Sequence, residues 1–373
     1  MMKSEPKPFD PREERARLIA FYLPQFHPIP ENDDWWGKGF TEWANVAKAR
    51  PNFKGHHQPH LPADLGFYDL RLPEILAAQA GLVRRYGLEG LCFYYYNFGG
   101  HRLLETPLDR WIEGGHRGLP FCLCWANESW TQHWDGRTGT TLIAQHYSAE
   151  SLQQIIRDLC RYLRHPDYIR VAGKPLLLVY RIGELPDPAT LAPLWRAACR
   201  DEGVGEISLA FVETFDQAVF LARPADIGFD ASVEFPPHGT SIPTPPPGRL
   251  LNPAFDGVVS DYREIARHYA TKPLPGFRRF RCAMPRWDNT PRQQDRPYVF
   301  ANASPGAFQA WLETLVEQAL DQGSGDEKIV FVNAWNEWAE GAHIEPDARF
   351  GHGFLEAVRN ALDRVYLPGR REP

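Results

Sequence analysis

The sequence has no hydrophobic run that approaches the ~18 apolar residues needed to span a bilayer. Its first 17 residues are charged and lack the apolar core of a secretory leader, so we expect no membrane insertion and a cytoplasmic location. Lys and Arg number 41 against 47 Asp and Glu, which gives a net charge of −6 with the charges interspersed. Because no basic stripe is present, nucleic acid is not expected as a partner.

Cysteine is sparse, with six residues in 373, and most of them lie in apolar segments where a thiol behaves as a small hydrophobic group. Cys122 and Cys124 form a C-x-C pair without a second pair of ligands, so the sequence predicts no metal site. No G-x-G-x-x-G follows the first predicted strand, and no internal repeat is visible. These absences argue against a dinucleotide cofactor and exclude solenoids and propellers.

Short apolar runs alternate with segments of helical period along the whole chain, which is typical of parallel β-α-β units. The predicted strands are residues 18–23, 88–95, 120–124, 175–180, 206–212, 229–234, 280–285 and 328–333. The predicted helices are residues 72–86, 103–117, 148–164, 190–201, 216–222, 260–270, 305–321 and 353–365. Eight such repeats predict an α/β fold, a closed (β/α)8 TIM barrel, with a doubly wound sheet as the alternative.

The barrel is expected to form a single domain over residues 18–366, with an N-terminal extension at 1–17 and a C-terminal tail at 367–373. Two predicted loops are long, one after the first strand at residues 24–70 and one after the sixth strand at residues 234–258. The second loop is rich in proline. Long, stiffened loops on a barrel are usually functional walls or lids.

Acids, amides and aromatic residues collect just after the predicted strands, where a barrel of this kind builds its active site. Aromatic rings pack on the C–H faces of sugars, and carboxylates and amides bind hydroxyl groups, so this mixture predicts a carbohydrate site. The alternative is that the aromatic residues only pack the barrel rim. The candidate substrate-binding residues are Trp36, Glu42, Trp43, His57, Tyr94, Tyr95, Trp125, Asn127, Glu128, Trp130, Glu213, Glu234, Trp287, Asp288, Asn333, Trp335, Asn336 and Trp338.

Glu337 and Glu340 form the sharpest chemical feature. Two carboxylates three residues apart on one helical turn lie about 5–6 Å apart at their roots, a separation suited to dividing acid and base or nucleophile roles. Their mutual repulsion separates the two pKa values, so one can stay protonated near neutral pH. The alternative is that Glu340 only complements a helix start while Glu337 is solvated. We expect Glu337 and Glu340 to be the catalytic residues.

Five blocks of sequence resemble the WbsX-like family, which is found in bacterial O-antigen and polysaccharide loci and is grouped with glycoside hydrolase family 99. The blocks are FYLPQFH at 21–27, WGKGFTEW at 36–43, FYYY at 93–96, WANE at 125–128 and NAWNEWAEG at 333–341. They occur in the expected order, and the resemblance extends over residues 18–364.

The resemblance implies a (β/α)8 barrel that cleaves glycosidic bonds without a metal or another cofactor. It implies that Glu337 assists the substrate 2-hydroxyl as it attacks the anomeric carbon, while Glu340 serves as general acid and then as base. Trp338 and Gly341 also match the family pattern, whereas Ala339 stands where hydrolases of family 99 typically carry His.

The sequence therefore predicts a glycoside hydrolase that cuts within an O-antigen or related bacterial polysaccharide, with an oligo- or polysaccharide as its partner. The main alternative is a glycosyltransferase of polysaccharide biosynthesis, because the WbsX-like name was given to proteins of that kind. The sequence offers neither a D-x-D motif nor a phosphate-binding Gly-rich loop for a nucleotide sugar. A non-catalytic glycan-binding module is the third reading, and it has no need of both glutamates.

Overall fold

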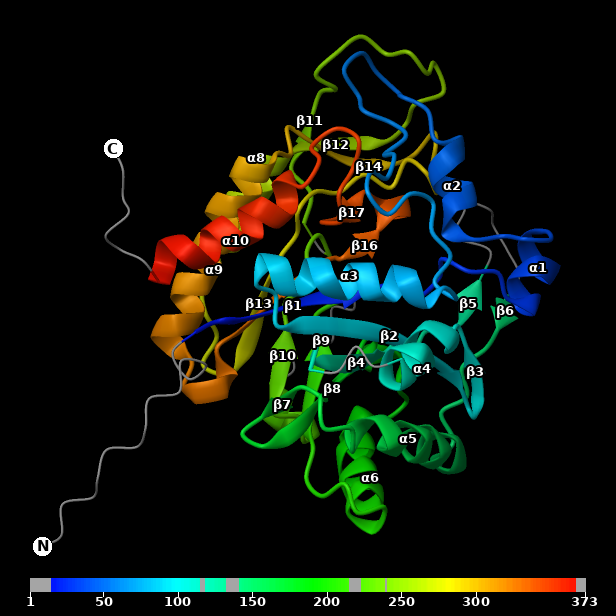
Figure 1. Cartoon of the computed structure of the whole chain (residues 1–373), viewed down its shortest axis with the longest axis vertical. Coiled ribbons are helices and arrows are strands. Elements are labelled where there is room, and N and C mark those ends of the chain that lie inside the picture. The colour runs from blue at the N-terminus through cyan, green and yellow to red at the C-terminus, as the bar shows by residue number, and fades with distance from the viewer. Residues whose placement is uncertain (1–14, 115–117, 132–140, 215–222, 239, 367–373) are drawn as a thin grey trace, which may run out of the picture.

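Eight parallel strands close into a barrel at the centre of the computed structural model, which describes residues 15–114, 118–131, 141–214, 223–238 and 240–366 (Figure 1). Each strand pairs with the next along the chain, and the last pairs with the first. The strands are β1 (Arg17–Tyr22), β2 (Gly90–Phe98), β4 (Phe121–Trp125), β8 (Lys174–Val179), β9 (Ser208–Val212), β10 (Ala231–Val233), β13 (Arg279–Ala283) and β15 (Ile329–Val332). The predicted (β/α)8 barrel is confirmed, since each predicted strand overlaps one of these strands.

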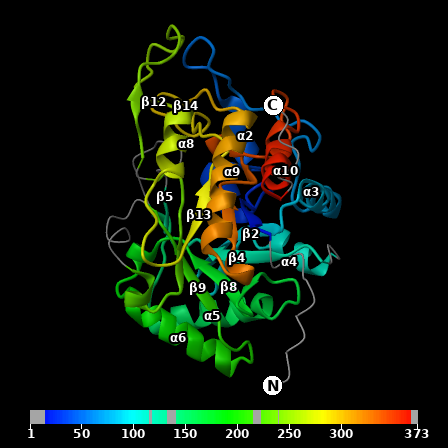
Figure 2. The same cartoon turned by 90° about the vertical axis from the view of Figure 1, so that its left-hand side faces the viewer.

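Helices surround the barrel on its outer side (Figure 2). They are α3 (Pro73–Tyr86), α4 (Thr106–Glu113), α5 (Ala149–Leu163), α6 (Pro188–Asp201), α8 (Tyr262–Ala270), α9 (Pro305–Gln322) and α10 (Gly353–Tyr366). Several begin at capping side chains, because Ser148, Asp187, Asp261 and Ser304 each accept a backbone N–H of the first turn. The predicted helix at 216–222 lies outside the described residues. None of the helices that the structure describes is long and apolar enough to cross a bilayer.

The predicted helix at 103–117 begins later than expected, at Thr106. Residues 101–103 instead form β3 (His101–Leu103), which pairs antiparallel with the end of β2. The other short elements of the barrel periphery are β5 (Trp130–Thr131), β6 (Thr141–Ile143), β7 (Arg170–Val171) and the 3₁₀ turns η2 (Ile182–Glu184), η3 (Pro224–Ile227) and η4 (Gly325–Glu327).

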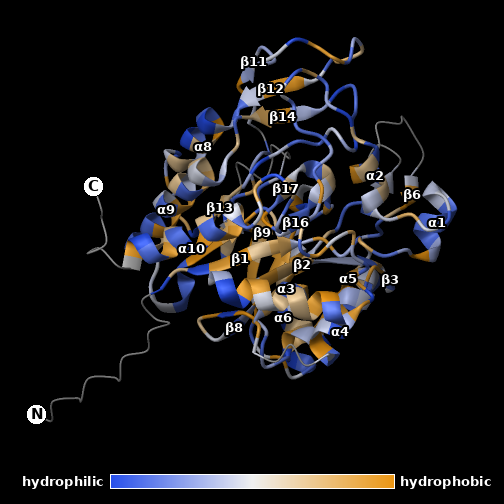
Figure 3. Cartoon of the chain, turned by 45° about the horizontal axis from the view of Figure 1, so that its top comes forward, coloured by the Kyte–Doolittle hydropathy of each residue, from blue (hydrophilic) through white to orange (hydrophobic). Residues whose placement is uncertain are grey.

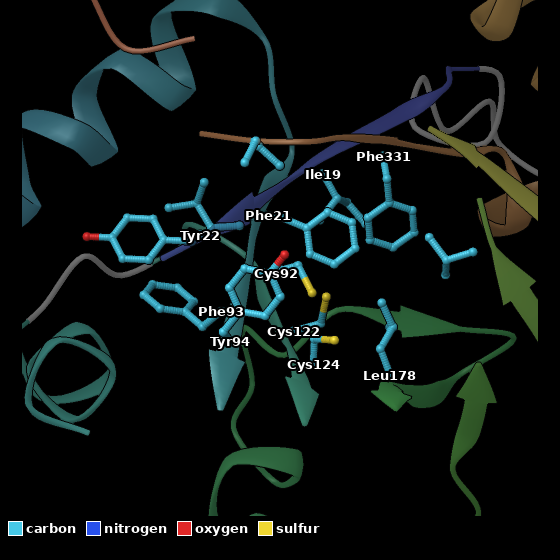
Figure 4. Close-up of a cluster of buried hydrophobic side chains, with 14 of the residues drawn as sticks. Ile19, Phe21, Tyr22, Cys92, Phe93, Tyr94, Cys122, Cys124, Leu178 and Phe331 are labelled. Carbon is cyan, nitrogen blue, oxygen red and sulfur yellow. The ribbon is translucent and has the colours of Figure 1, made fainter. Parts of the chain in front are cut away.

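Side chains alternate between the barrel interior and the helix layer along each strand, as the period of two requires. Figure 4 shows Phe21, Tyr94 and Phe331 gathered with the thiols of Cys92, Cys122 and Cys124. The outward neighbours pack differently: Tyr22 donates a hydrogen bond to Gln79 of α3, and Phe93 contacts Trp111 of α4. All six cysteines are buried free thiols, so Cys122 and Cys124 fill the core.

The loops at the carboxyl ends of the strands carry extra structure, and they rise above the hydrophobic barrel strands in Figure 3. After β1 come α1 (Pro30–Trp36) and α2 (Glu42–Lys48). The long loop after β10 forms β11 (Pro243–Thr244) and β12 (Val258–Asp261), and β12 pairs with β14 (Tyr298–Ala301) from the loop after β13. After β15 come β16 (Asn336–Glu337), η5 (Trp338–Glu340) and β17 (Ala342–His343). Both long loops therefore cover the face where the candidate residues were expected.

Replacing Phe331 by Ala should destabilise the barrel strongly. The ring is fully buried and lies 5.3 Å from Phe21 and 6.2 Å from Phe280 between centroids. Truncation of a buried Phe costs about 3–5 kcal/mol, because a cavity remains. Urea unfolding measures the change, and Leu251→Ala on an exposed loop serves as the control, with an expected change within about 0.5 kcal/mol. Equal losses in the two variants would contradict this packing.

Candidate active site

A cavity with about 520 Å³ of empty space opens at the carboxyl ends of the barrel strands. Residues at or after the ends of β1, β2, β4, β8, β10, β13 and β15 line it, namely Leu23, Tyr94, Tyr96, Ala126, Glu128, Tyr180, Phe235, His238, Arg292, Glu337 and Glu340. Four predicted site residues thus meet here: Glu337, Glu340, Tyr94 and Glu128.

The segment that carries Glu337 and Glu340 is a tight 3₁₀ turn and not the α-helical turn that the spacing suggested. Glu337 ends β16, and η5 follows directly. Side chains at i and i+3 eclipse in a 3₁₀ turn, which brings the two carboxylates to the same side. Gly341 ends the turn at φ 66°, and a Cβ there would lie 2.9 Å from the backbone nitrogen of Asp288. Only glycine meets both demands.

Arg292 is the cation at the centre of the site, and it was not among the predicted residues. Its Nη1 lies 2.5 Å from Oε1 of Glu340, and its Nη2 lies 3.5 Å from Oε2 of Glu337. The same Nη2 lies 3.3 Å from Oε2 of Glu42, whose side chain is 1 % exposed. One guanidinium therefore faces three carboxylates, and full ionisation would leave an excess of two negative charges.

Burial and this excess of charge raise the pKa values of the acid pair. Burial raises the pKa of Glu337 well above its usual value, the charge of Glu340 adds to the effect, and Arg292 opposes it. Burial also raises the pKa of Glu340, against the opposing effect of Arg292. Glu128 has a raised pKa for the same main reason. The site therefore retains a proton at a pH where an isolated glutamate would be ionised.

Trp335 and Trp338 fix the loop that carries Glu337 and Glu340. Both are buried, and their indole nitrogens each donate a 2.7 Å hydrogen bond to Glu345. Tyr68 and Gln79 donate to the same carboxylate at 2.8 and 2.7 Å. The two tryptophans were expected to contact substrate, but the structure uses them to position the turn that carries the acid pair.

The side chains of Asn336 and Asn333 also form hydrogen bonds to backbone atoms of other loops. Asn336 accepts from the Leu23 nitrogen at 2.7 Å and donates to the Leu23 oxygen at 2.9 Å, which ties the loop to the end of β1. Asn333 donates to the Pro236 oxygen at 2.8 Å. Asn127 binds the backbone of Arg181 in the same way, through bonds of 2.7 and 2.8 Å. The carboxamides of Asn336 and Asn127 join neighbouring strand ends, whereas Asn333 joins the end of β15 to the loop after β10, two strands away.

Tyr95 and Trp125 point away from the cavity. Tyr95 packs against Tyr162 of α5, whereas its neighbours Tyr94 and Tyr96 line the cavity. Trp125 is fully buried against Trp195 of α6 and donates to the Asn97 oxygen. Alternation along a strand sends successive side chains to opposite faces, and these two residues occupy the outer face.

Glu213 and Glu234 also lie outside the lining of the cavity that the described residues define. Glu213 accepts from Arg279 at 2.6 Å, and Glu234 accepts from Arg281 at 2.8 Å. Arg281 reaches on to Gln318 of α9, which places these ion pairs between the barrel and its helices. Glu213 pairs with the partly buried Arg279 and Glu234 with the buried Arg281, and neither glutamate takes part in the cluster around Arg292.

The remaining predicted residues fall into two groups. His57, Trp287 and Asp288 line a second cavity of about 650 Å³ of empty space, where Asp288 accepts from His56 and Gln58. The others pack at the rim: Trp36 against Phe40, Trp43 against Trp338, and Trp130 against Tyr96.

Sequence reasoning missed several cavity residues besides Arg292, namely Tyr96, Tyr180, Phe235 and His238. The alternation of β2 could have indicated Tyr96, since it follows Tyr94 by two positions. Burial lowers the pKa of His238 to about 3, so its imidazole is neutral near pH 7. Nothing in the local sequence around Arg292 indicates that it meets glutamates from two distant loops.

Comparison with known proteins agrees with the sequence resemblance. Residues 18–358 match the model of a family described as Glycosyltransferase WbsX. The chain is 51% identical over 354 residues to WxcX, an uncharacterized protein present in two strains of Xanthomonas campestris pv. campestris. That alignment covers 94% of this chain and 50% of WxcX, so the chain spans about half the length of these curated relatives.

Solved structures share the barrel at low sequence identity. The endo-alpha-mannosidase of glycoside hydrolase family 99 from Bacteroides thetaiotaomicron superposes with a TM-score of 0.57 at 15% identity, covering 94% of this chain and 97% of the mannosidase. A glycoside hydrolase-like protein gives a TM-score of 0.58 at 14% identity, covering 96% of this chain and 97% of the other. At these identities the likeness establishes the fold alone.

Replacing Glu345 by Ala should destabilise the protein and loosen the neighbouring turn. Four buried donors would lose their acceptor, and an unsatisfied buried donor typically costs about 1–3 kcal/mol. We expect a loss of about 3 kcal/mol or more in urea unfolding. Glu356→Ala, at an exposed position of α10, is the control and should change stability by less than about 0.5 kcal/mol. Equal stability of the two variants would argue against the anchoring role.

The stability contributed by Glu345 should depend on pH. Burial raises its pKa from 4.5 to about 7, against the four donated hydrogen bonds. Because the pKa of Glu345 is higher in the folded than in the unfolded protein, protonation of Glu345 stabilises the fold. This contribution is fully present below about pH 4.5 and is lost as the pH rises through about 7. Relative to Glu345→Gln, the wild-type protein should lose about 3 kcal/mol of unfolding free energy across that window. Parallel stability curves in urea titrations of the two proteins would contradict the shift.

Proposed function

The chain belongs to the WbsX glycosyltransferase family, and from the geometry of its site we propose that it is a glycoside hydrolase acting on a bacterial polysaccharide. One observation carries the proposal: a buried Glu337 and a partly buried Glu340 on one turn share a single arginine, with raised pKa values, in a cavity lined by tyrosines. The barrel shared with the endo-acting mannosidase supports a glycosidase-type enzyme.

The proposed reaction divides its two roles between Glu337 and Glu340. Glu337 removes the proton of the sugar 2-hydroxyl as that oxygen bonds to the anomeric carbon. Glu340 gives a proton to the glycosidic oxygen as it leaves, and the bond to the leaving group breaks. Water, deprotonated by Glu340, then opens the ring formed by the 2-oxygen, which takes its proton back from Glu337.

Without substrate, the proton that the pair shares lies on Glu337 and not on Glu340. Arg292 binds Glu340 more closely than Glu337, which favours the ionised form of Glu340, while Glu337 has its pKa raised further. We therefore propose that the pair shares one proton and that a bound sugar shifts it to Glu340, by competing for the Arg292 contact. The two glutamates titrate as a unit in this scheme.

The cavity walls supply the groups that would hold the sugar. Burial raises the pKa values of Tyr94, Tyr96 and Tyr180 well above 10, so their hydroxyls are neutral donors and acceptors. Glu128, which also lines the cavity, would accept from sugar hydroxyls. Ala339, at the position where family 99 hydrolases typically carry His, is fully buried.

The glycosyltransferase reading remains the alternative because the family carries that description. Incubating the protein with a panel of bacterial O-antigen polysaccharides, without any nucleotide sugar, separates the two. New reducing ends would support hydrolysis, and their size distribution would distinguish endo from exo cleavage. Sugar transfer that requires an activated donor would instead support the transferase. Binding without either reaction would favour a glycan-binding module.

Glu340→Gln and Glu337→Gln should affect two kinds of substrate differently. Loss of a general acid typically costs about 10²–10⁴-fold, so Glu340→Gln should slow cleavage of a natural glycoside by that order. An aryl glycoside with an activated leaving group needs little protonation and should lose much less. Glu337→Gln should impair both substrates, since the attacking oxygen needs help whatever leaves. Steady-state kinetics on the two substrates measure the contrast.

Glu356→Gln, far from the cavity on α10, is the matched control and should keep wild-type rates on both substrates. If both site variants cleave the natural substrate at near wild-type rate, the pair is structural. Glu128 would then be the remaining glutamate in the described lining of the cavity.

A further inference from the structure

A shallow groove adjoins the catalytic cavity and extends away from it. Lys48, Arg50 and residues 291–296 line this groove, which has about 1150 Å³ of empty space, against about 520 Å³ for the cavity. Arg292 lines both, so the two spaces adjoin at this residue. A polymer that passes Arg292 would contact both.

The groove is basic on a chain whose net charge is −6. Lys48, Arg50 and Arg296 bring three cations, against the single carboxylate of Asp295 in the lining. Neither Lys48 nor Arg50 forms an ion pair with a carboxylate within the described part of the chain. Arg296 reaches Asp256 at 3.6 Å, but both side chains are more than three-quarters exposed, so that contact is weak. Arg292 itself is neutralised by the three glutamates.

Hydrogen bonds hold the two walls of the groove together. The side chain of Gln294 accepts from the Arg50 nitrogen and donates to the Arg50 oxygen, both at 3.0 Å. Asn52 donates to the Gln294 oxygen at 2.9 Å. The backbone that carries Arg50 is thus fixed against the loop that carries Arg292, which reduces the ordering cost of binding.

We propose that this groove binds acidic sugar residues, so that the substrate is an anionic polysaccharide whose charged residues lie beside the cleaved bond. The inference rests on the proposed function for the position of that bond. The ligand chemistry is a carboxylate or phosphate carried by a carbohydrate. The cavity holds an excess of carboxylates and repels such a group, whereas the groove attracts it, and this difference sets the order of sugars along the site.

The diphosphate of a nucleotide sugar is a second source of anionic charge. An open groove in which cations lie beside the carboxamide of Gln293 suits a polymer with both charges and hydroxyls. A nucleoside diphosphate therefore serves as a competing probe in the test.

The test measures binding of three acidic polysaccharides, polygalacturonate, alginate and hyaluronan, and of the same polymers after reduction of their carboxyl groups to alcohols. The wild-type protein should bind at least one acidic polymer more tightly than its reduced form. Raising the ionic strength from about 0.01 M to about 1 M shortens the screening length from about 30 Å to about 3 Å and should remove that preference.

The combined change Lys48→Gln and Arg50→Gln should weaken binding of the preferred acidic polymer about tenfold, as expected for two exposed ion pairs. The matched control is Arg84→Gln with Arg85→Gln, which removes the same charge from the end of α3, next to the start of β2 and away from the groove. The control should bind like the wild type.

Three results would overturn the proposal: no preference for any acidic polymer, equal losses in the two double variants, or displacement of the polymer by uridine diphosphate. The last would assign the groove to a nucleotide. Preferential, groove-dependent binding without new reducing ends would keep the groove assignment and reject the hydrolase. Cleavage of neutral polysaccharides alone, without such binding, would keep the hydrolase and reject the groove assignment.

Discussion

The site depends on one largely buried guanidinium, that of Arg292, placed among three carboxylates. Glu42 comes from the loop after β1, Arg292 from the loop after β13, and Glu337 and Glu340 from the loop after β15. These segments are distant in sequence, and the barrel brings them together because its parallel strands all end at one face. Without the cation, the three acids, two of them buried, would repel one another, and the loops would lose the contact that joins them.

The barrel could be predicted from the sequence because strands buried on both faces read as continuous apolar runs, and eight such runs alternate with helical segments. Because both faces of such a strand are apolar, the sequence does not show which residues face the barrel interior and which face the helices. In the run from Phe93 to Tyr96 every position is aromatic, so only the structure shows that Tyr94 and Tyr96 face the cavity while Tyr95 faces α5. The outward acids Glu213 and Glu234 could not be recognised either, because their arginine partners lie on β13.

The type of a polar or aromatic residue does not show whether its side chain faces the cavity or supports the surrounding structure. Tryptophans next to a strand end, such as Trp335 and Trp338, are typical of residues that stack on sugar rings. In the structure both are buried and donate hydrogen bonds to Glu345. The pairing of Arg292 with the glutamates is a long-range contact, which no local pattern encodes. What the sequence does indicate is the turn with Glu337 and Glu340, since both acids fall next to a strand end and within one turn.

The fit of Gly341 against the backbone of Asp288 has a practical meaning for anyone redesigning this protein. A single added carbon at that position meets the main chain of another loop, so the turn from Glu337 to Gly341 tolerates little variation in backbone. Lys48 and Arg50, by contrast, are exposed side chains on a separate segment. Substitution at Lys48 and Arg50 therefore changes the surface charge there, while the backbone of the turn from Glu337 to Gly341 stays undisturbed.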